Sequence, residues 1–346
     1  MKNSSDEPSE DSELNRVEVT SGNQFRLLAA VLLPALVGLG LGVFAIRVAE
    51  IYGLTLFLML PVIVSFLSAF MWKLGQPVSY GKCYWVSVLS LLALGVMIVL
   101  IALDGLICLL MALPLAMVLA TFGTLLGFWA ALRLGRGKGS GLSVFLVALF
   151  PMLVSFERSV ESEFPPQREV TTTIEIDAPI EEVWRHVVTF TDIDAPPEGI
   201  FRLGIAYPIR ARIEGKGVGA VRYCEFSTGP FVEPITAWEA PHRLAFDVVE
   251  NPPPMEEFSL YDHVDPPHLH GHMESERGQF QLEERDGKIL LHGTTWYRHN
   301  MGPQFYWGPI TDHIIHRIHD RVLEHIKSEA ELGVQQQTTK PQDKSA

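Results

Sequence analysis

The stretch from residue 26 to residue 156 carries only nine charged side chains, seven basic and two acidic, in 131 residues. A domain of this size that faced water would expose far more charge, whereas the hydrocarbon of a bilayer excludes it. Apolar runs occur at Leu27–Ile46, Leu54–Met71, Val86–Leu103 and Leu106–Leu132. Each run is near or above the ~18 to 20 residues that a helix needs to cross a bilayer. The stretch therefore predicts an α-helical transmembrane bundle.

A fifth apolar run, Leu142–Phe156, has 15 residues. At ~1.5 Å per residue it covers only about 22 Å, so it either crosses a thinned bilayer or re-enters on one side. With five spans, eight basic residues lie on the side of the N-terminus and two on the other. This bias favours about five transmembrane helices in residues 26–156, with the N-terminus cytoplasmic and the C-terminal domain extracytoplasmic.

The residues on both sides of the bundle are polar. Residues 1–25 carry six acidic and two basic side chains with little to bury, so we expect a disordered tail that is not a signal peptide. Residues 157–168 contain Pro165 and Pro166 and are predicted to be a linker. A soluble domain follows at residues 169–332, and residues 333–346 are predicted to be a second disordered tail.

Residues 157–346 hold 32 acidic side chains, 18 basic ones and all 12 histidines of the chain. An acidic domain repels phosphate, so nucleic acid is not expected as a partner. The three cysteines include no CxxC pair and give no disulfide framework. The sequence also lacks GxSxG, HExxH and GxxxxGK[ST], which disfavours a hydrolase, a zinc protease and a nucleotide-binding protein.

The hydrophobic pattern of the soluble domain changes from period two to helical spacing and back. Val170–Ile176 alternates as a half-buried strand does, and Asp177-Ala178-Pro179 then starts a short helix. An isoleucine stripe along Pro309–Leu332 predicts a long amphipathic helix. Between the two helices, alternation predicts antiparallel strands near Ile209–Glu214, Ala220–Ser227, Phe231–Trp238, Arg243–Glu250, Met273–Glu284 and Ile289–Tyr297.

The segment Thr172–Trp184, with its Ile-Asp-Ala-Pro turn and Val-Trp pair, resembles the opening of the SRPBCC superfamily, the START-like or polyketide cyclase/dehydrase-like proteins. The hairpin Gly217–Arg222 and the strand Gly278–Leu282 extend the resemblance, which covers about residues 168–332. It implies a helix-grip α+β domain, in which a curved antiparallel sheet surrounds the long C-terminal helix and leaves a cavity for an apolar ligand. The superfamily spans lipid carriers, hormone receptors and ring cyclases, so the resemblance alone implies no one activity.

Three histidines and a carboxylate occupy alternate positions before and along one predicted strand: His268, His270, His272 and Glu274. The same alternation reaches Phe280 and Leu282, so these polar side chains point toward the cavity unless a bulge near Gly278 resets the pattern. Three readings are open: a polar lining of the cavity mouth, an exposed loop cluster, or a zinc site. We expect no metal and no cofactor, and we assign His270, His272 and Glu274 to ligand binding.

The long helix offers two further groups of polar residues. Asp312, His313, His316, His319 and Asp320 are predicted to lie mostly opposite the isoleucine stripe, on a solvated face. Arg321 and His325 fall at the edge of the apolar arc or within it, which favours the pocket. With Arg222, Trp238 and Tyr297 from the predicted strands, they complete the candidate ligand-binding residues.

The first prediction is a multi-pass protein of a bacterial plasma membrane whose START-like domain binds a hydrophobic small molecule or lipid. One alternative is a cyclase- or dehydratase-like enzyme that uses His270, His272 or Glu274 as its acid or base. A second alternative is a structural or assembly protein whose core is filled and binds no ligand. The sequence leaves the oligomeric state open.

Overall fold

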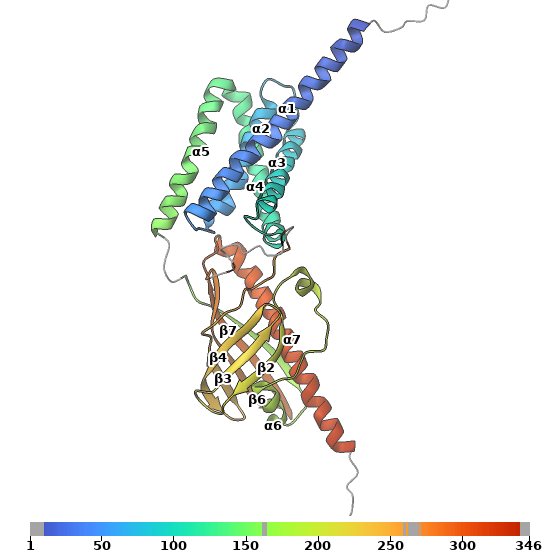
Figure 1. The fold of residues 1–346 in the computed structure, drawn as a ribbon, viewed down its shortest axis with the longest axis vertical. Coiled ribbons are helices and arrows are strands. Elements are labelled where there is room, and N and C mark those ends of the chain that lie inside the picture. Colours follow the sequence, from blue (N-terminus) through green and yellow to red (C-terminus); the bar gives the residue numbers. More distant parts are fainter. Residues whose placement is uncertain (1–9, 161–164, 259–260, 262–268, 270, 340–346) are drawn as a thin grey trace, which may run out of the picture. The chain divides into compact units, whose positions relative to one another are not determined.

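The computed structural model describes residues 10–160, 165–258, 261, 269 and 271–339, and it divides into two compact units (Figure 1). A helical unit contains α1 (Glu10–Val43), α2 (Leu60–Lys73), α3 (Tyr80–Leu100), α4 (Leu106–Arg133) and α5 (Gly135–Val160). Two short π-helical segments, η1 (Phe44–Val48) and η2 (Thr55–Met59), lie between α1 and α2. Five helical segments of this unit are long and apolar enough to cross a membrane.

The fifth helix is longer than the apolar run that predicts it. Its candidate span, Gly137–Val160, has 24 residues, which at ~1.5 Å per residue is about 36 Å. Glycine and serine before Leu142 and the polar residues after Phe156 continue the helix at both ends, so the fifth helix is long enough to span although its apolar run is short. At the other end of the unit, α1 begins at Glu10 and includes residues 10–25, for which we predicted disorder.

Helix α2 is the most buried of the candidate spans, and α4 packs closely against it through two glycines. A Cβ atom built on Gly123 would lie 2.5 Å from the carbonyl oxygen of Val62, and one on Gly127 would overlap the carbonyl of Phe66. These contacts allow the backbones of α2 and α4 to approach more closely than any larger side chain would permit.

The sheet unit is a seven-stranded antiparallel sheet that curls around the long helix α7 (Figure 1), which confirms the predicted helix-grip fold. Its strand order is β1-β7-β6-β5-β4-β3-β2. The short helices α6 (Ile180–Val188) and η3 (Gly199–Leu203) lie between β1 and β2 in the sequence. The strands are β1 (Arg168–Ile176), β2 (Pro208–Glu214), β3 (Val221–Phe226), β4 (Gly229–Glu239), β5 (Arg243–Asp247), β6 (Met273–Arg285) and β7 (Lys288–His299).

Local sequence explains the tightest connection and the core. Asp286 and Gly287 have φ angles of 52° and 78°, as the two-residue turn between β6 and β7 requires. Helix α7 spans Gln304–Thr339, so residues 333–339, for which we predicted disorder, are helical. The core lies between the inner face of the sheet, α6 and α7, and includes Ile176, Val183, Leu244, Leu282, Leu291, Leu323 and Ile326.

Candidate functional site

The interior of the sheet unit contains a buried ion pair. Arg222 on β3 and Glu233 on β4 are directly opposite in the register, and their side chains pair with only 1% and 6% of each residue exposed. Three aromatic rings surround the guanidinium, with centroids 5.7 Å (Phe190), 5.5 Å (Phe246) and 5.6 Å (Phe280) from its central carbon. A charged group therefore lies among apolar rings, where solvation by water is lost.

The pairing leaves part of the guanidinium without hydrogen bonds. Nη1 of Arg222 donates to Glu233, whereas Nε and Nη2 are buried and have no nitrogen or oxygen partner among the described residues. The thiol of Cys224, a weak acceptor, lies beside them. Burial opposes the charge, but the neighbouring Glu233 and Cys224 raise the pKa of Arg222 above its ordinary value, so the group stays cationic. Unpaired buried donors each cost about 1 to 3 kcal/mol, and an oxygen atom of a bound molecule would recover that cost.

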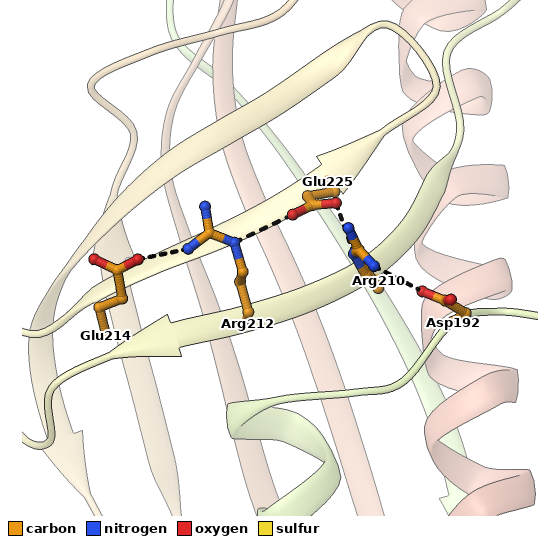
Figure 2. A network of polar contacts seen from close by, with 5 residues as sticks. All are labelled: Asp192, Arg210, Arg212, Glu214 and Glu225. Carbon is orange, nitrogen blue, oxygen red and sulfur yellow. Dashed lines mark hydrogen bonds and ion pairs between the residues drawn. The ribbon is translucent and has the colours of Figure 1, made fainter.

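The segment after α6 brings Phe190 to this pair. Phe190 exchanges two backbone hydrogen bonds with Ala211 of β2, at 3.2 and 3.1 Å. Figure 2 shows the exposed ion pairs beside it: Asp192 lies 3.6 Å from Arg210, which also binds Glu225 of β3 at 2.7 Å. The same network continues from Glu225 through Arg212 to Glu214 (Figure 2). Such exposed pairs contribute little stability, so the backbone bonds of Phe190 hold the segment in place.

A cleft of about 470 Å³ lies between residues 193–201 and the side of α7 from Arg317 to Glu329. Arg321 holds its rim together by donating hydrogen bonds to the carbonyls of Ala195 (2.7 Å), Pro196 (3.3 Å) and Pro208 (3.1 Å). Both Arg321 and His325, which we assigned to the pocket from the sequence, line this cleft.

His325 connects the cleft with the interior. Its ring packs at 5.8 Å against Phe190, whose ring in turn contacts the guanidinium of Arg222. Burial lowers the pKa of His325, so its imidazole is neutral near pH 7. Phe190 thus separates the cleft from the free nitrogens of Arg222.

A second polar group lies where α7 contacts β1 and β7. Tyr297 donates to Asp312 at 2.7 Å and accepts from Nε of Arg168 at 3.1 Å, while Arg168 and Asp312 form an ion pair. Burial, followed by the bond to Asp312, raises the pKa of Tyr297. About two turns further along α7, His319 bonds to Thr172 (3.1 Å) and Thr295 (2.8 Å). We call these six residues the α7 seam.

The α7 seam corrects one prediction. We expected Asp312, His316 and His319 on a solvated face, but Asp312 and His319 are partly buried where they bond to β1 and β7. His316 is exposed, as we expected, although it also bonds to Thr172 of β1. Burial lowers the pKa of His319 to about 4. His313 is exposed, as we expected. The wide polar arc of α7 therefore contributes to the contact with the sheet.

The histidine run also differs from its prediction. A bulge lies between Ser275 and Arg277, so Ser275 is opposite Tyr297 on the face toward α7 and Glu274 is opposite Arg298 on the other face. Glu274 is exposed and does not point into the interior. The bulge shifts the alternation of β6 by one residue. Phe280, three residues after Arg277, therefore lies on the inner face, opposite Gly293.

The remaining residues that we predicted to bind ligand do not lie together. His272 pairs with Asn300 at 2.6 Å, and His270 and His268 lie outside the described residues. Trp238 packs edge-on against Trp184 of α6, at 5.7 Å between centroids, as a core residue does. The structure thus brings Arg222 close to the cleft of Arg321 and His325, but not Tyr297, Trp238 or Glu274.

Sequence reasoning missed Glu233 and Phe190. Glu233 alternates with Phe231 and Ile235 in a predicted strand, which places a carboxylate on an apolar face and was a usable signal. Phe190 follows α6 in an irregular segment, where no periodicity marks its direction.

Comparison with known proteins assigns the class of the sheet unit. Residues 167–282 match the family described as "Polyketide cyclase / dehydrase and lipid transport". This segment of the chain is a polyketide cyclase/dehydrase-type domain of the SRPBCC superfamily. No curated protein matches the chain in a sequence search.

Solved structures of low identity also align with the chain. The Aha1 dimer from Colwellia psychrerythraea is 16% identical, with 48% of this chain and 98% of that chain covered and a TM-score of 0.28. The di-domain ARO/CYC StfQ from the steffimycin biosynthetic pathway is 7% identical, with 58% and 63% covered and a TM-score of 0.33. Norcoclaurine synthase from Thalictrum flavum, in complex with dopamine and hydroxybenzaldehyde, is 12% identical, with 51% and 91% covered and a TM-score of 0.32.

Proposed function

We propose that the sheet unit binds a hydrophobic small molecule or lipid that carries an oxygen acceptor, and that the five apolar helices hold this domain at a membrane. The observation that carries the proposal is the guanidinium of Arg222, which is buried among three phenylalanine rings with two nitrogens unpaired. The rings match an apolar body, and the free nitrogens match a carbonyl, carboxylate or hydroxyl oxygen.

The ligand reaches this position from the cleft between residues 193–201 and α7. Phe190 lies between His325 at the cleft and Arg222 inside, so its ring moves aside to admit an apolar group. The bonds of Arg321 to three carbonyls fix the rim of the cleft while Phe190 moves. Movement of one aromatic side chain requires no change in the sheet.

Membrane attachment gives the domain access to its ligand. Hydrophobic molecules concentrate in a bilayer, and five helices long enough to cross one precede the domain in the same chain. The bias of eight basic residues to two supports a cytoplasmic N-terminus and an extracytoplasmic domain, in a plasma membrane that we take to be bacterial.

The enzyme alternative has less support than binding. That alternative named three residues as acid or base: Glu274 lies on the outer face of β6, His272 bonds to Asn300, and His270 lies outside the described residues. A filled core without ligand is the other alternative, and the binding experiment distinguishes it from the proposal.

The test is saturable binding to the sheet unit, residues 165–339, across a panel of fatty acids, sterols and aromatic polyketides. Hydrogen bonds to a charged group contribute about 1.5 to 3 kcal/mol, so we expect Arg222→Met combined with Glu233→Leu to weaken binding about tenfold or more. Removing both partners leaves no uncompensated buried charge, and thermal unfolding checks that the double variant is folded. Native mass spectrometry of the purified unit identifies any ligand that is retained.

The matched control is Arg210→Met combined with Glu225→Leu, which removes a more exposed pair that joins β2 to β3. We expect this variant to bind as the unsubstituted protein does. Absence of saturable binding across the panel would contradict the proposal and favour the filled core.

A further inference from the structure

The helical unit contains a groove of about 420 Å³ that is separate from the site in the sheet unit. Its walls come from α1, α2, α3 and α4 and are almost entirely apolar, with Gly42, Leu60, Leu94 and Leu109 among the lining residues. The groove is open at Gly42, where a Cβ atom added to the glycine would have its nearest neighbour, an atom of Leu60, 3.9 Å away.

The groove opens toward the surroundings of the bundle. Leu92 and Val96 of α3 and Leu110 of α4 line it and are also exposed. In a bundle that crosses a membrane, exposed leucine and valine side chains on these helices face lipid tails. The groove is therefore accessible to a hydrocarbon chain from the bilayer.

One end of the groove is polar. Asp104 lies there, in the connection between α3 and α4, and accepts a hydrogen bond from the backbone N–H of Gly105 at 2.8 Å. Arg47 follows the lining residue Ile46 and reaches the carbonyl of Ala102 in the same connection at 3.5 Å. Arg47 is exposed and has no acidic partner within the part of the chain that the structure describes. An exposed cation thus lies beside the polar end of an apolar groove.

The backbone at this end is held in place. The chain is not α-helical between Phe44 and Met59, and the carboxylate of Glu157 accepts the N–H groups of Leu54 at 2.5 Å and Thr55 at 2.9 Å. Arg158 donates to the carbonyl of Ala49 at 2.7 Å. Interrupted helices at membrane depth occur where the backbone lines a cavity or is buried in protein, and here Leu56 of η2 lines the groove.

We propose that this groove holds one acyl chain of an anionic phospholipid, with the phosphate against Arg47. The apolar walls match the chain, and the exposed guanidinium of Arg47 matches the phosphate. The carboxylate of Asp104 at the same end accepts the backbone N–H of Gly105, and the phosphate must lie on the Arg47 side of it. The inference rests on the proposed insertion of α1 to α5 in a membrane and is independent of what the sheet unit binds.

The experiment uses the full chain in phosphatidylcholine vesicles that contain a phosphatidylglycerol probe with a photoactivatable group on its acyl chain. Peptides labelled on illumination are identified by mass spectrometry. We expect labelling of the segments of α3 and α4 that line the groove. Gly42→Leu should reduce this labelling about tenfold because its side chain occupies the groove.

Gly40→Leu is the matched control, because Gly40 is two residues away on the same helix, does not line the groove, and has no atom within 4 Å of a built Cβ. It should label as the unsubstituted protein does. Arg47→Gln should remove the preference for phosphatidylglycerol over a phosphatidylcholine probe, whereas Arg133→Gln at the C-terminal end of α4 should keep it.

Equal labelling of the Gly42→Leu and Gly40→Leu variants would overturn the groove as the binding site. An unchanged lipid preference in Arg47→Gln would overturn the anionic headgroup. Absence of label from all five helices would overturn membrane insertion as well as the groove. None of these three results would alter ligand binding by the isolated sheet unit.

Discussion

Two arginine–carboxylate pairs lie on the inner face of the sheet unit, and they differ in how completely each is satisfied. The side chains of Arg222 and Glu233 are 2% and 7% exposed, and Nε and Nη2 of Arg222 have no nitrogen or oxygen partner among the described residues. The side chains of Arg168 and Asp312 are 33% and 28% exposed, and Tyr297 joins both of them. Among the described residues, the first pair leaves two buried donors unpaired, whereas the second pair leaves no buried polar atom without a partner.

This difference in hydrogen bonding indicates that Arg222 is available to bind a ligand, whereas Arg168 and Asp312 connect α7 to the sheet. The second pair shares more hydrogen bonds, because Nε and Nη2 of Arg168 both donate to Asp312 and Nε also donates to Tyr297. A buried pair that leaves donors unpaired loses stability, which a ligand restores. Four predictions test this distinction.

The largest expected effect comes from Arg222→Met in the sheet unit. It leaves the carboxylate of Glu233 buried without a partner, and we expect the free energy of unfolding in urea to fall by about 3 to 5 kcal/mol. Adding Glu233→Leu should restore most of the loss. Asp312→Asn in the more exposed pair should cost less than half as much. A cost below about 1 kcal/mol for Arg222→Met would show that the two pairs do not differ.

The second effect is a pH dependence of the α7 seam. The pKa of His319 is about 4 in the folded protein and near 6.5 when unfolded, so protonation favours the unfolded state. The stability is fully present above pH 6.5 and should fall by up to about 3 kcal/mol as the pH drops toward 4. His319→Gln should flatten that part of the profile, measured by urea unfolding at several pH values. His313→Gln, at an exposed position on the same helix, should leave the slope unchanged.

The third effect is the removal of one hydroxyl from the satisfied pair. Tyr297→Phe loses the bond to Asp312 and the bond from Arg168, so we expect the free energy of unfolding to fall by about 1 to 2 kcal/mol. Calorimetric titration with any ligand found by the panel should give an unchanged affinity. A loss of affinity as large as that of the Arg222 double variant would place Tyr297 in the binding site, as we predicted from the sequence.

The smallest effect belongs to Glu274, on the outer face of β6. Glu274→Gln should change the free energy of unfolding by less than about 0.5 kcal/mol and leave ligand affinity unchanged. Reduced affinity in this variant, with the fold intact, would indicate that Glu274 contacts the ligand and would support the enzyme alternative.

The strands were predictable because their side chains alternate between a buried and an exposed face. The predicted Ile209–Glu214 became Pro208–Glu214, and the predicted Met273–Glu284 became Met273–Arg285. A bulge near Gly278 was named from the sequence only as a possibility, because one extra residue in a strand leaves no signal in composition, and the structure has it after Ser275. That single residue decided the direction of Glu274.

The candidate site was predictable in part. Arg321 and His325 were found from their position on the apolar arc of α7, and both line the cleft. The partner of Arg222 was not found, because pairing across β3 and β4 depends on register, which the sequence alone does not fix. His319 was misplaced because Thr172 on β1 and Thr295 on β7 give the inner face of the sheet polar groups that bond to its ring.

The pairing of β1 with β7 has a consequence for biosynthesis. Arg168 is opposite Tyr297, which lies 129 residues later in the sequence. The first strand of the sheet is therefore synthesised long before the strand with which it pairs. During that interval the exposed edges of β1 and β6 are open to pairing with other chains. A nascent chain that stops after Arg285 would present both edges together, and we expect it to aggregate where the complete chain folds.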